Sequence, residues 1–332
     1  MKKTLARWAQ DIWYKDQFIG VWLCPLGFLF CDLVRFRKLL YRLGVLKKQT
    51  VSVPVIVVGN ITVGGTGKTP FVIELASLLK EAGYKPGIIS RGYGGLAESW
   101  PQRVDENSNA ELVGDEALLL VRQTDCPVAV GPVRADAANL LLAQTDCNVI
   151  VSDDGLQHYA LARDIEIAVI DGERRFGNGY CLPAGPLREP IDRLQSVDFR
   201  IVNGAEKEDE EYSMQLIGDR AINLVTGQQK SLKDFSAVEC HAIAGIGNPE
   251  RFFNLLATAG ISCATRSFPD HYRFERHDIA FNDDKPVLMT EKDAVKCTAF
   301  AGSQHWYVPV KAVLEQGFSE QLLNLLKAKN NG

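Results

Sequence analysis

Short apolar runs alternate with longer segments of mixed character along most of the chain. The run over residues 53–59 is rich in β-branched residues, which predicts a strand buried on both faces of a parallel sheet. A glycine-rich loop follows over 60–69, and Pro70 suits the first turn of the helix predicted over 70–82. Further strands are predicted over 86–90, 128–130, 148–152, 165–170 and 198–202, and further helices over 114–124 and 132–144. Strands that alternate with helices predict an α/β fold with a doubly wound, mostly parallel sheet.

The pattern changes near Asn203. The segment 204–236 is mainly polar and charged, and its two short alternating runs, 212–217 and 220–225, predict a hairpin-like linker. Beyond it the alternation resumes, with strands predicted over 240–243, 286–289 and 306–309 and helices over 249–259 and 291–297. The predicted organisation is a helical segment 1–50, a core 51–203, the linker 204–236 and a second, smaller α/β lobe 237–332.

The first 50 residues differ in charge from the rest. They carry ten basic and three acidic residues, a net charge of +7, whereas the remaining residues carry 27 basic and 38 acidic ones, a net charge of −11. Three of the five tryptophans, Trp8, Trp13 and Trp22, also lie there. Tryptophan rings and cations favour the headgroup region of an anionic membrane. An acidic body, in turn, argues against a nucleic-acid partner.

The apolar run over residues 18–31 is interrupted by Pro25 and followed by Asp32. A membrane-spanning helix needs about 20 apolar residues. The run also lacks a small-residue cleavage site and precedes a basic stretch, so a signal peptide fits poorly. We therefore expect an N-terminal membrane-associated helix that lies at the bilayer surface. The alternative is an amphipathic helix packed on the protein itself.

The chain has 332 residues, 46% of them hydrophobic and 23% charged, which is typical of a globular protein with a sizeable core. Its eight cysteines include no C-x-x-C pair. This pattern disfavours a structural zinc site or a disulfide scaffold and favours a reducing compartment.

The glycine-rich loop lies between the predicted buried strand and the predicted helix, which is the setting of a phosphate-binding loop. Backbone N–H groups and the positive end of the helix bind phosphate oxygens there, while Lys68 reaches the β and γ phosphates and the Thr69 hydroxyl ligates Mg²⁺. Thr62 occupies a position where the strict P-loop pattern has glycine, and the doubled glycine at 64–65 supplies flexibility instead. The predicted nucleotide-binding residues are Thr62, Val63, Gly64, Gly65, Thr66, Gly67, Lys68 and Thr69.

A P-loop site also needs a carboxylate for the metal, at the end of a neighbouring strand. Asp153 and Asp154 follow the strand predicted over 148–152, at the same carboxyl edge of the sheet as the loop. Either of the two is the metal ligand. Gln157 and His158 come directly after, and His158 is either a structural hydrogen-bonding residue or part of the cleft.

Transfer of a phosphoryl group requires a proton acceptor and cations for the developing charge. Asp115 and Glu116 stand at a predicted helix start, where acids also serve as caps. His271 reaches the cleft only if the two lobes meet. The segment 290–293 is close to the guanine-binding N-K-x-D motif, but its lysine is one position out of place. Loop arginines that can supply the cations are Arg91, Arg134 and Arg188.

Seven motifs appear in order along the chain: V-G-N-x₃-G-G-T-G-K-T-P at 58–70, S-R-G-Y-G at 90–94, G-D-E at 114–116, D-D-G-L-Q-H at 153–158, P-A-G-P-L-R-E at 183–189, D-H at 270–271 and T-E-K-D-A-V at 290–295. Together they resemble the tetraacyldisaccharide 4′-kinase (lipid A 4′-kinase) family, and the match covers nearly the whole chain.

The resemblance implies a P-loop kinase that uses ATP and Mg²⁺. It implies transfer of the γ-phosphate to the 4′-hydroxyl of a tetraacylated glucosamine disaccharide 1-phosphate, giving the bis-phosphorylated lipid A precursor (lipid IVA) of lipopolysaccharide biosynthesis. The protein would be monotopic on the cytoplasmic face of the inner membrane of a Gram-negative bacterium, with the acylated lipid and the membrane surface as partners and no obligate protein partner.

The resemblance also implies residue roles. Asp115 is the base that accepts the hydroxyl proton, and His271 tunes or orients it. Asp153 and Asp154 match metal-associated carboxylates. Residues expected to line the substrate and phosphate cleft are Tyr93, Glu116, Arg134, Gln157, His158, Arg188 and Glu189.

Two other functions fit part of the pattern. The first is a membrane-associated P-loop ATPase whose hydrolysis drives a protein partner. The second is a kinase for a soluble metabolite, in which the N-terminal helix serves only for packing.

Overall fold

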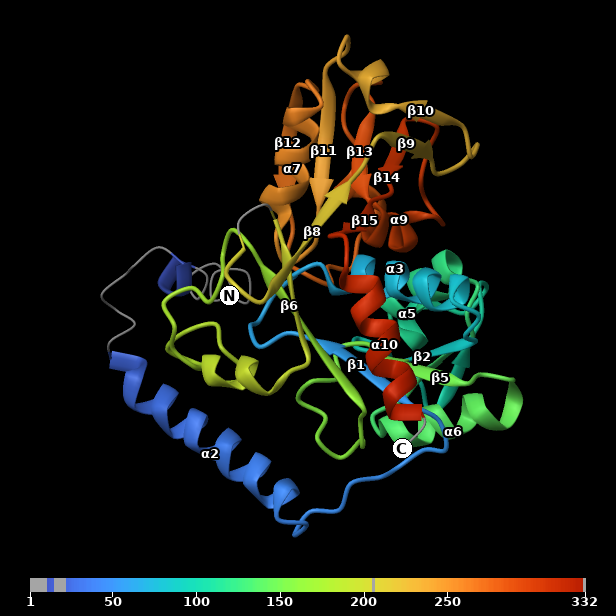
Figure 1. Ribbon diagram of the computed structural model, residues 1–332. Helices are drawn as coiled ribbons and strands as arrows, with labels where there is room; N and C mark the ends of the chain where they lie inside the picture. The colour runs from blue at the N-terminus through green and yellow to red at the C-terminus, as the bar shows by residue number, and fades with distance from the viewer. Residues whose placement is uncertain (1–10, 15–21, 205–206, 331–332) are drawn as a thin grey trace.

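Two β-sheets organise the computed structural model, which describes residues 11–14, 22–204 and 207–330 (Figure 1). The larger sheet has nine strands. In spatial order they are β15 (Lys311–Leu314), β8 (Glu211–Ile217), β7 (Phe199–Asn203), β6 (Ile165–Asp171), β1 (Val55–Gly59), β5 (Val149–Ser152), β2 (Pro86–Ser90), β4 (Val128–Val130) and β3 (Gln102–Val104). Strands β8 to β4 pair in parallel, and the two edge strands, β15 and β3, pair antiparallel.

The central strand β1 supplies both faces of this sheet, because successive side chains point to opposite sides. Ile56 and Val58 pack into the core on one face, and Val55 and Val57 pack into the core on the other. The first core is covered by α3 (Lys68–Glu81), α5 (Asp115–Thr124) and α10 (Phe318–Asn330), and the second by α6 (Arg134–Gln144). Short elements beside them are α4 (Ala110–Val113) and the 3₁₀ helix η2 (Ile191–Ser196). The predicted doubly wound, mostly parallel sheet is confirmed.

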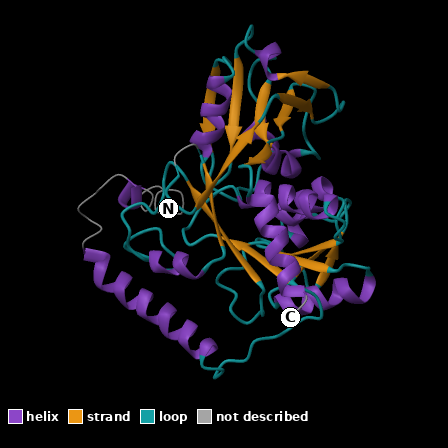
Figure 2. Cartoon of the chain, viewed as in Figure 1, coloured by secondary structure: helices purple, strands orange, loops and turns teal. Residues whose placement is uncertain are grey.

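The smaller sheet has six strands and lies above the larger one in Figures 1 and 2. In spatial order they are β10 (Gln229–Ser231), β9 (Arg220–Asn223), β14 (His305–Val308), β13 (Val287–Thr290), β11 (Cys240–Ala244) and β12 (Cys263–Ser267). The helices beside it are η3 (Leu232–Phe235), α7 (Pro249–Thr258), α8 (Arg276–Ile279) and α9 (Glu291–Cys297). The four strands from β14 to β12 pair in parallel, so the predicted second α/β unit is present.

The predicted hairpin is wrong. Strand β8 pairs with β7 and β15 in the larger sheet, whereas β9 pairs with β14 and β10 in the smaller one. Only Gly218 and Asp219 separate the two strands, so the chain passes from one sheet to the other there. A two-residue Gly-Asp connection between alternating runs has the local pattern of a hairpin turn, and only the partner strands tell the two arrangements apart.

The end of the chain returns to the larger sheet, although the sequence placed it in the smaller lobe. Strand β15 extends the larger sheet, and Phe318, Leu322 and Leu326 of α10 are fully buried in its core. The division of the chain into separate domains at 50, 203 and 236 stays a prediction.

Helix α2 (Cys24–Arg42) lies along one side of the larger sheet's half (Figure 1). Its inner side is attached by contacts to the body: Arg35 pairs with Asp192 at 3.0 Å, and Lys38 donates to the Ser196 hydroxyl at 3.2 Å. Many large apolar residues of this helix and its flanks are exposed to solvent: Trp22, Leu26, Phe28, Leu29, Leu33, Phe36, Leu39, Leu43 and Val45.

The predicted membrane-associated segment is only partly described. Residues 1–10 and 15–21, which include Trp8 and the beginning of the apolar run 18–31, lie outside the described residues. Within the described ranges, no helix combines the length and the apolar character needed to cross a membrane.

Candidate active site

The predicted phosphate loop connects β1 to α3 at the carboxyl edge of the larger sheet. Gly67 caps α3 with φ +95°, and a Cβ there would lie 2.3 Å from the Asn203 amide nitrogen. That amide donates to the Thr66 carbonyl at 3.0 Å. The Val63 N–H donates to the Pro186 carbonyl at 2.8 Å. The loop is therefore held in shape by the strands and loops around it, with the N-terminus of a 14-residue helix at its end, where unpaired N–H groups favour anions.

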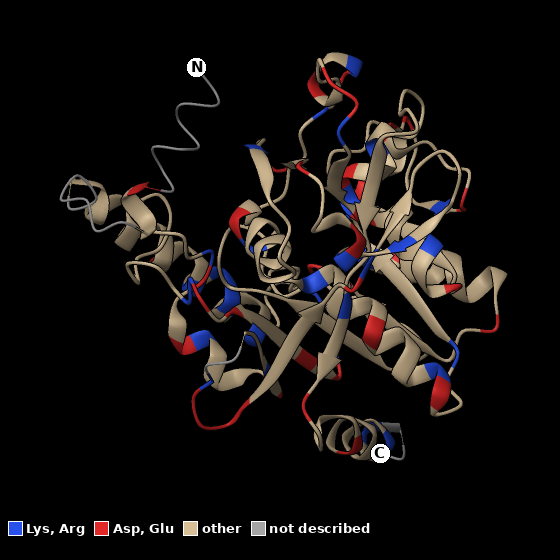
Figure 3. Ribbon diagram, turned by 90° about the horizontal axis from the view of Figure 1, so that it is seen from above, with Lys and Arg blue, Asp and Glu red and all other residues tan. Residues whose placement is uncertain are grey.

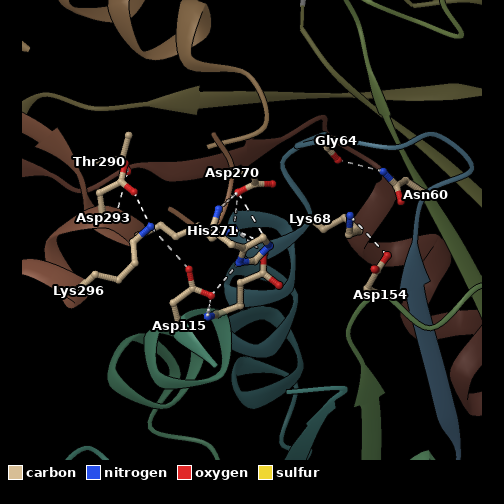
Figure 4. A network of polar contacts seen from close by, with 12 residues as sticks. Asn60, Gly64, Lys68, Asp115, Asp154, Asp270, His271, Thr290, Asp293 and Lys296 are labelled. Carbon is tan, nitrogen blue, oxygen red and sulfur yellow. Dashed lines mark hydrogen bonds and ion pairs between the residues drawn. The ribbon is translucent and has the colours of Figure 1, made fainter. Parts of the chain in front are cut away.

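Lys68 and Arg188 meet at the carboxylate of Asp154. The Lys68 Nζ lies 3.4 Å from one carboxylate oxygen, and Arg188 lies 3.0 Å from the other (Figure 4 shows the lysine and the aspartate). Burial by itself raises the pKa of Asp154, but the charges of Lys68 and Arg188 outweigh it and lower this pKa below the usual range. Two cations thus stand beside the phosphate loop, balanced by one carboxylate.

Asp153 has a different environment from its neighbour. Its side chain is fully buried, and its Oδ1 has no hydrogen-bond partner among the described residues. Burial, followed by the charges of Glu116 and Asp154, raises the pKa of Asp153. Arg134 is also buried, donates to the Gly131 carbonyl at 2.9 Å, and has its pKa lowered by burial to about 10. A buried carboxylate with an unpaired oxygen favours a cation beside it.

Asp115 and His271 come from the two halves of the molecule. Asp115 is the first residue of α5, and His271 lies between β12 and α8 on the side of the smaller sheet. The His271 Nδ1 is 3.2 Å from the Asp115 Oδ1, which also accepts the Glu116 N–H at 3.0 Å (Figure 4). Burial raises the pKa of Asp115, but the hydrogen bond with His271 and the charge of Lys292 lower it to about 2. The Asp115 carboxylate is therefore ionised at neutral pH.

The pKa of His271 moves in the opposite direction. Burial lowers it, the hydrogen bond with Asp115 raises it, and the net effect is a pKa above the usual value. The ring of Tyr93 lies 4.9 Å from the His271 ring, and the backbone of His271 is left-handed, with φ +55°. Such a conformation costs a non-glycine residue roughly 1–2 kcal/mol. The contacts with Asp115 and Tyr93 offset this cost and hold the ring in place.

A cleft of about 2160 Å³ lies between the two halves. The predicted site residues that line it are Val63, Gly64, Gly65, Thr66, Gly67, Lys68, Thr69, Tyr93, Glu116, Arg134, Asp154, Gln157, His158, Arg188 and His271. Residues of α2, among them Phe30, Val34 and Arg37, line the same cleft. The segments that sequence reasoning predicted for one site are thus brought to one cleft, together with the N-terminal helix.

Four predicted site residues do not line this cleft: Thr62, Asp115, Asp153 and Glu189. For Glu189 the prediction of a cleft position is wrong, since its side chain is 1% exposed. Its carboxylate accepts hydrogen bonds from Gln157, at 2.7 Å, and from the Tyr159 hydroxyl. Glu189 therefore supports Gln157 from behind, because a buried carboxylate needs such partners.

His158 lines the cleft with a neutral ring. Burial, followed by the charges of Arg134 and Arg163, lowers its pKa to about 4. Its Nε2 is buried and has no hydrogen-bond partner among the described residues.

The smaller sheet also contacts the phosphate loop directly. A Cβ at Gly247, which follows β11, would lie 2.1 Å from the Gly65 backbone nitrogen. Arg174 holds this contact from the larger sheet's side by donating to the Gly247 carbonyl at 2.8 Å and to the Asn248 side chain at 3.0 Å. Sequence reasoning did not single out Gly247 or Arg174, because neither stands in a phosphate-binding pattern.

Two lysines near the Asp115–His271 pair were also missed. Lys292 and Lys296 of α9 face the acids at the start of α5 (Lys292–Glu116 2.8 Å, Lys296–Asp115 3.8 Å). In the view of Figure 3, both acidic and basic residues appear near the centre of the molecule. The T-E-K-D-A-V segment was the available signal, since it places a lysine on a short helix directly after a buried strand.

The chain is similar to known proteins over nearly its full length. The family model described as Tetraacyldisaccharide-1-P 4′-kinase matches residues 19–327. The tetraacyldisaccharide 4′-kinase of Nitrosococcus oceani is 51% identical over 95% of this chain and 93% of its own length, and that of Hahella chejuensis is 45% identical over 96% of both.

A solved structure is similar as well. A crystal structure of the "apo" form of LpxK from Aquifex aeolicus in complex with ATP has a TM-score of 0.77 and 28% identity, covering 94% of this chain and 99% of that one. The family resemblance in the motifs is confirmed, and the chain belongs to the tetraacyldisaccharide-1-P 4′-kinase family of kinases.

Proposed function

We propose that this protein transfers the γ-phosphate of ATP to the 4′-hydroxyl of a tetraacylated glucosamine disaccharide 1-phosphate, giving the bis-phosphorylated lipid A precursor. One observation carries the proposal: one cleft is lined by the phosphate loop of the larger sheet and by His271, which is hydrogen-bonded to Asp115 across the two halves. The related LpxK structure contains ATP, which supports ATP as the donor here.

The phosphate loop acts on the donor. Its N–H groups and the N-terminus of α3 bind phosphate oxygens. Lys68 and Arg188, which both contact the Asp154 carboxylate, stabilise the charge on the transferred group. Cations aimed at the developing charge are the main source of acceleration in phosphoryl transfer.

Asp115 is the proposed proton acceptor for the 4′-hydroxyl. Asp115 is ionised at neutral pH. Its partner His271 lines the cleft, whereas Asp115 itself does not. The hydrogen bond between the two orients the carboxylate. The two together place a base directly beside the cleft that His271 lines. General bases of this kind contribute about 10²–10⁴-fold to a rate.

Mg²⁺ is the metal we propose, and the residues present fit it. The unpaired buried oxygen of Asp153 suits a divalent cation, and the Thr69 hydroxyl stands at the first turn of α3. No group of three or more acidic, histidine or cysteine side chains within the described ranges is arranged as a metal site. Proteins often hold Mg²⁺ with one or two carboxylates plus the substrate's phosphates. When bound, it would neutralise charge on the β and γ phosphates.

We further propose that the protein works at the cytoplasmic face of the inner membrane as a monotopic enzyme that needs no protein partner. The exposed apolar residues of α2 and the exposed Arg37 and Arg42 on the same helix support attachment to an anionic bilayer surface. Because α2 also lines the cleft, an acylated acceptor could reach the site without leaving the bilayer.

Transfer of label tests the activity. Purified protein, Mg²⁺, γ-labelled ATP and the tetraacyl disaccharide 1-phosphate in detergent micelles should give labelled lipid, and Lys68→Ala should abolish it. ATP hydrolysis without lipid labelling would reject the proposal and favour an ATPase that drives a protein partner. Undiminished activity after deletion of residues 1–35 would reject the role of the N-terminal segment.

Attachment is tested with vesicles. Replacing exposed Leu29 and Leu33 with glutamate should release the protein from vesicles that contain anionic lipid, whereas Val313→Glu, a change at an exposed position of β15, should not. Retention of the double variant on the vesicles would contradict the role of α2.

A further inference from the structure

Lys292 contacts the Asp115–His271 pair from the smaller sheet. Its ammonium lies 2.8 Å from the Glu116 carboxylate, 3.1 Å from the Asp270 carboxylate and 3.5 Å from the His271 Nε2. We propose that Lys292 is a positioning residue for the transfer reaction, which holds the His271 ring neutral with Nδ1 facing Asp115. The inference rests on the proposed function, in which that pair accepts the proton of the acceptor.

The hydrogen-bonding capacity of lysine determines the orientation of the ring. An ammonium group has three N–H donors and no acceptor. Lys292 faces three partners, and its 3.5 Å contact with the His271 Nε2 is a hydrogen bond only when that nitrogen carries a lone pair. The ring proton then stands on Nδ1 and is donated to the Asp115 Oδ1 at 3.2 Å. This is the neutral tautomer of histidine that leaves Asp115 ionised and hydrogen-bonded.

Charge acts in the same direction. The charged groups that face His271 are Asp115 of α5, Asp270 of its own loop and Lys292 of α9, with the Tyr93 ring at its side. Asp115 and Asp270 favour a protonated ring, and Lys292 opposes it. Without Lys292 the ring would gain a proton more readily, and a cationic ring beside Asp115 makes that carboxylate a weaker base.

Helix α9 is anchored firmly enough to position a side chain. Asp293 is fully buried and accepts hydrogen bonds from the Thr290 hydroxyl and the Gly245 N–H, both at 2.7 Å. Lys296, one turn after Lys292, lies 2.7 Å from Asp293 and 3.8 Å from Asp115 (Figure 4). Asp115, the proposed base, is thus contacted by a helix whose N-terminus is hydrogen-bonded to the end of β11.

Lys292 also lines the cleft, so the rival role is direct binding of a substrate phosphate. Kinetics distinguish the two roles. We would measure kcat and KM for ATP and for the micellar acceptor between pH 5.5 and 9.5 in wild type, Lys292→Met and Lys292→Arg. The matched control is Lys285→Met, which removes an exposed lysine paired with Glu239 outside the cleft.

For Lys292→Met we expect kcat at pH 7 to fall about tenfold or more, with both KM values within about twofold of wild type. The acidic limb of the kcat/KM profile should move up by about one pH unit, so the loss should shrink at high pH. Lys292→Arg should recover most of the rate, and Lys285→Met should match wild type. A raised KM with an unmoved pH profile would overturn the proposal and make Lys292 a substrate ligand.

A second readout does not depend on turnover. In protein with ¹⁵N-labelled histidine, the His271 signal, assigned with His271→Ala, should report a neutral ring protonated on Nδ1 at pH 7.5 in wild type and a charged ring in Lys292→Met. If Lys292→Met does not fold, Lys292→Gln serves instead. An unchanged ring would overturn the proposal. If the wild-type protein transfers no label to the lipid, the proposed function is rejected. The titration of the His271 ring would still test whether Lys292 holds that ring neutral.

Discussion

The phosphate loop and the Asp115–His271 pair are built in opposite ways. The loop is one continuous segment between β1 and α3, and its shape depends on neighbours close by in the larger sheet. The pair joins residues 156 positions apart and exists only because the smaller sheet lies against the larger one. We infer that the loop is mostly complete within the larger sheet, with one supporting contact from Gly247, whereas the base depends entirely on how the two halves meet.

The largest effect that sharpens this contrast is expected for Asp115→Asn. The change keeps the shape of the side chain but removes its ability to accept a proton, so kcat should fall about 10²-fold or more. The KM for ATP should stay within about twofold, because the loop is untouched. Asp146→Asn, at an exposed aspartate paired with Lys85, is the matched control for losing a carboxylate. A near-normal rate would reduce Asp115 to a helix-capping residue.

A smaller effect is expected for Gly247→Ala, which tests how much the smaller sheet contributes to the phosphate loop. The new methyl group would lie 2.1 Å from the Gly65 nitrogen, so the two halves must move apart at the phosphate loop. We expect kcat/KM for ATP to fall about tenfold, since small displacements of bound groups are costly. Gly260→Ala, at a left-handed turn (φ +79°) with nothing within 4 Å of the added Cβ, is the control: its backbone strain should lower stability and leave the ATP kinetics unchanged. Unchanged ATP kinetics would mean that the smaller sheet does not contribute to the loop.

The smallest effect concerns stability and pH. The pKa of His271 is raised in the folded protein by its hydrogen bond with Asp115, against the effect of burial. A raised histidine pKa stabilises the fold below the unfolded value of about 6.5 and loses this contribution as pH rises through the folded value. The free energy of unfolding of wild type minus that of His271→Ala should therefore be larger at pH 5.5 than at pH 9.

Denaturant titrations at several pH values would measure this difference. The pH range of these titrations should stay above 5. Asp115, whose pKa is about 2, then stays ionised in the folded protein, and the carboxylates of the unfolded chain stay ionised as well. A difference that grows with pH would mean that the pair does not hold His271 in the way described.

The same contrast explains what the sequence could predict. Strand β1, the glycine-rich loop and α3 follow from local patterns, because a buried strand, a loop and a proline in the first turn are all contiguous. Asp115 and His271 were selected through family motifs, and neither Lys292 nor Gly247 was assigned a role. These two act through contacts between the sheets, and no local periodicity carries information about such contacts.

The errors have the same origin. The runs that form β8 and β9 have a hairpin's pattern, yet each strand has partners elsewhere in the chain. Glu189 was expected in the cleft from the family resemblance of its motif, but the chain turns it inward to Gln157 and Tyr159. In both cases the local sequence was interpreted correctly as strand or loop, and the missing information was the identity of distant neighbours.

The most direct test of the contrast is ATP binding measured alongside phosphate transfer in Lys68→Ala and Asp115→Asn. Calorimetry with ATP and Mg²⁺ gives the affinity, and labelled transfer to the micellar lipid gives the rate. We predict that Lys68→Ala loses both, whereas Asp115→Asn binds ATP like wild type and loses only transfer. Equal loss of ATP affinity in the two variants would contradict the separation of roles between the loop and the pair.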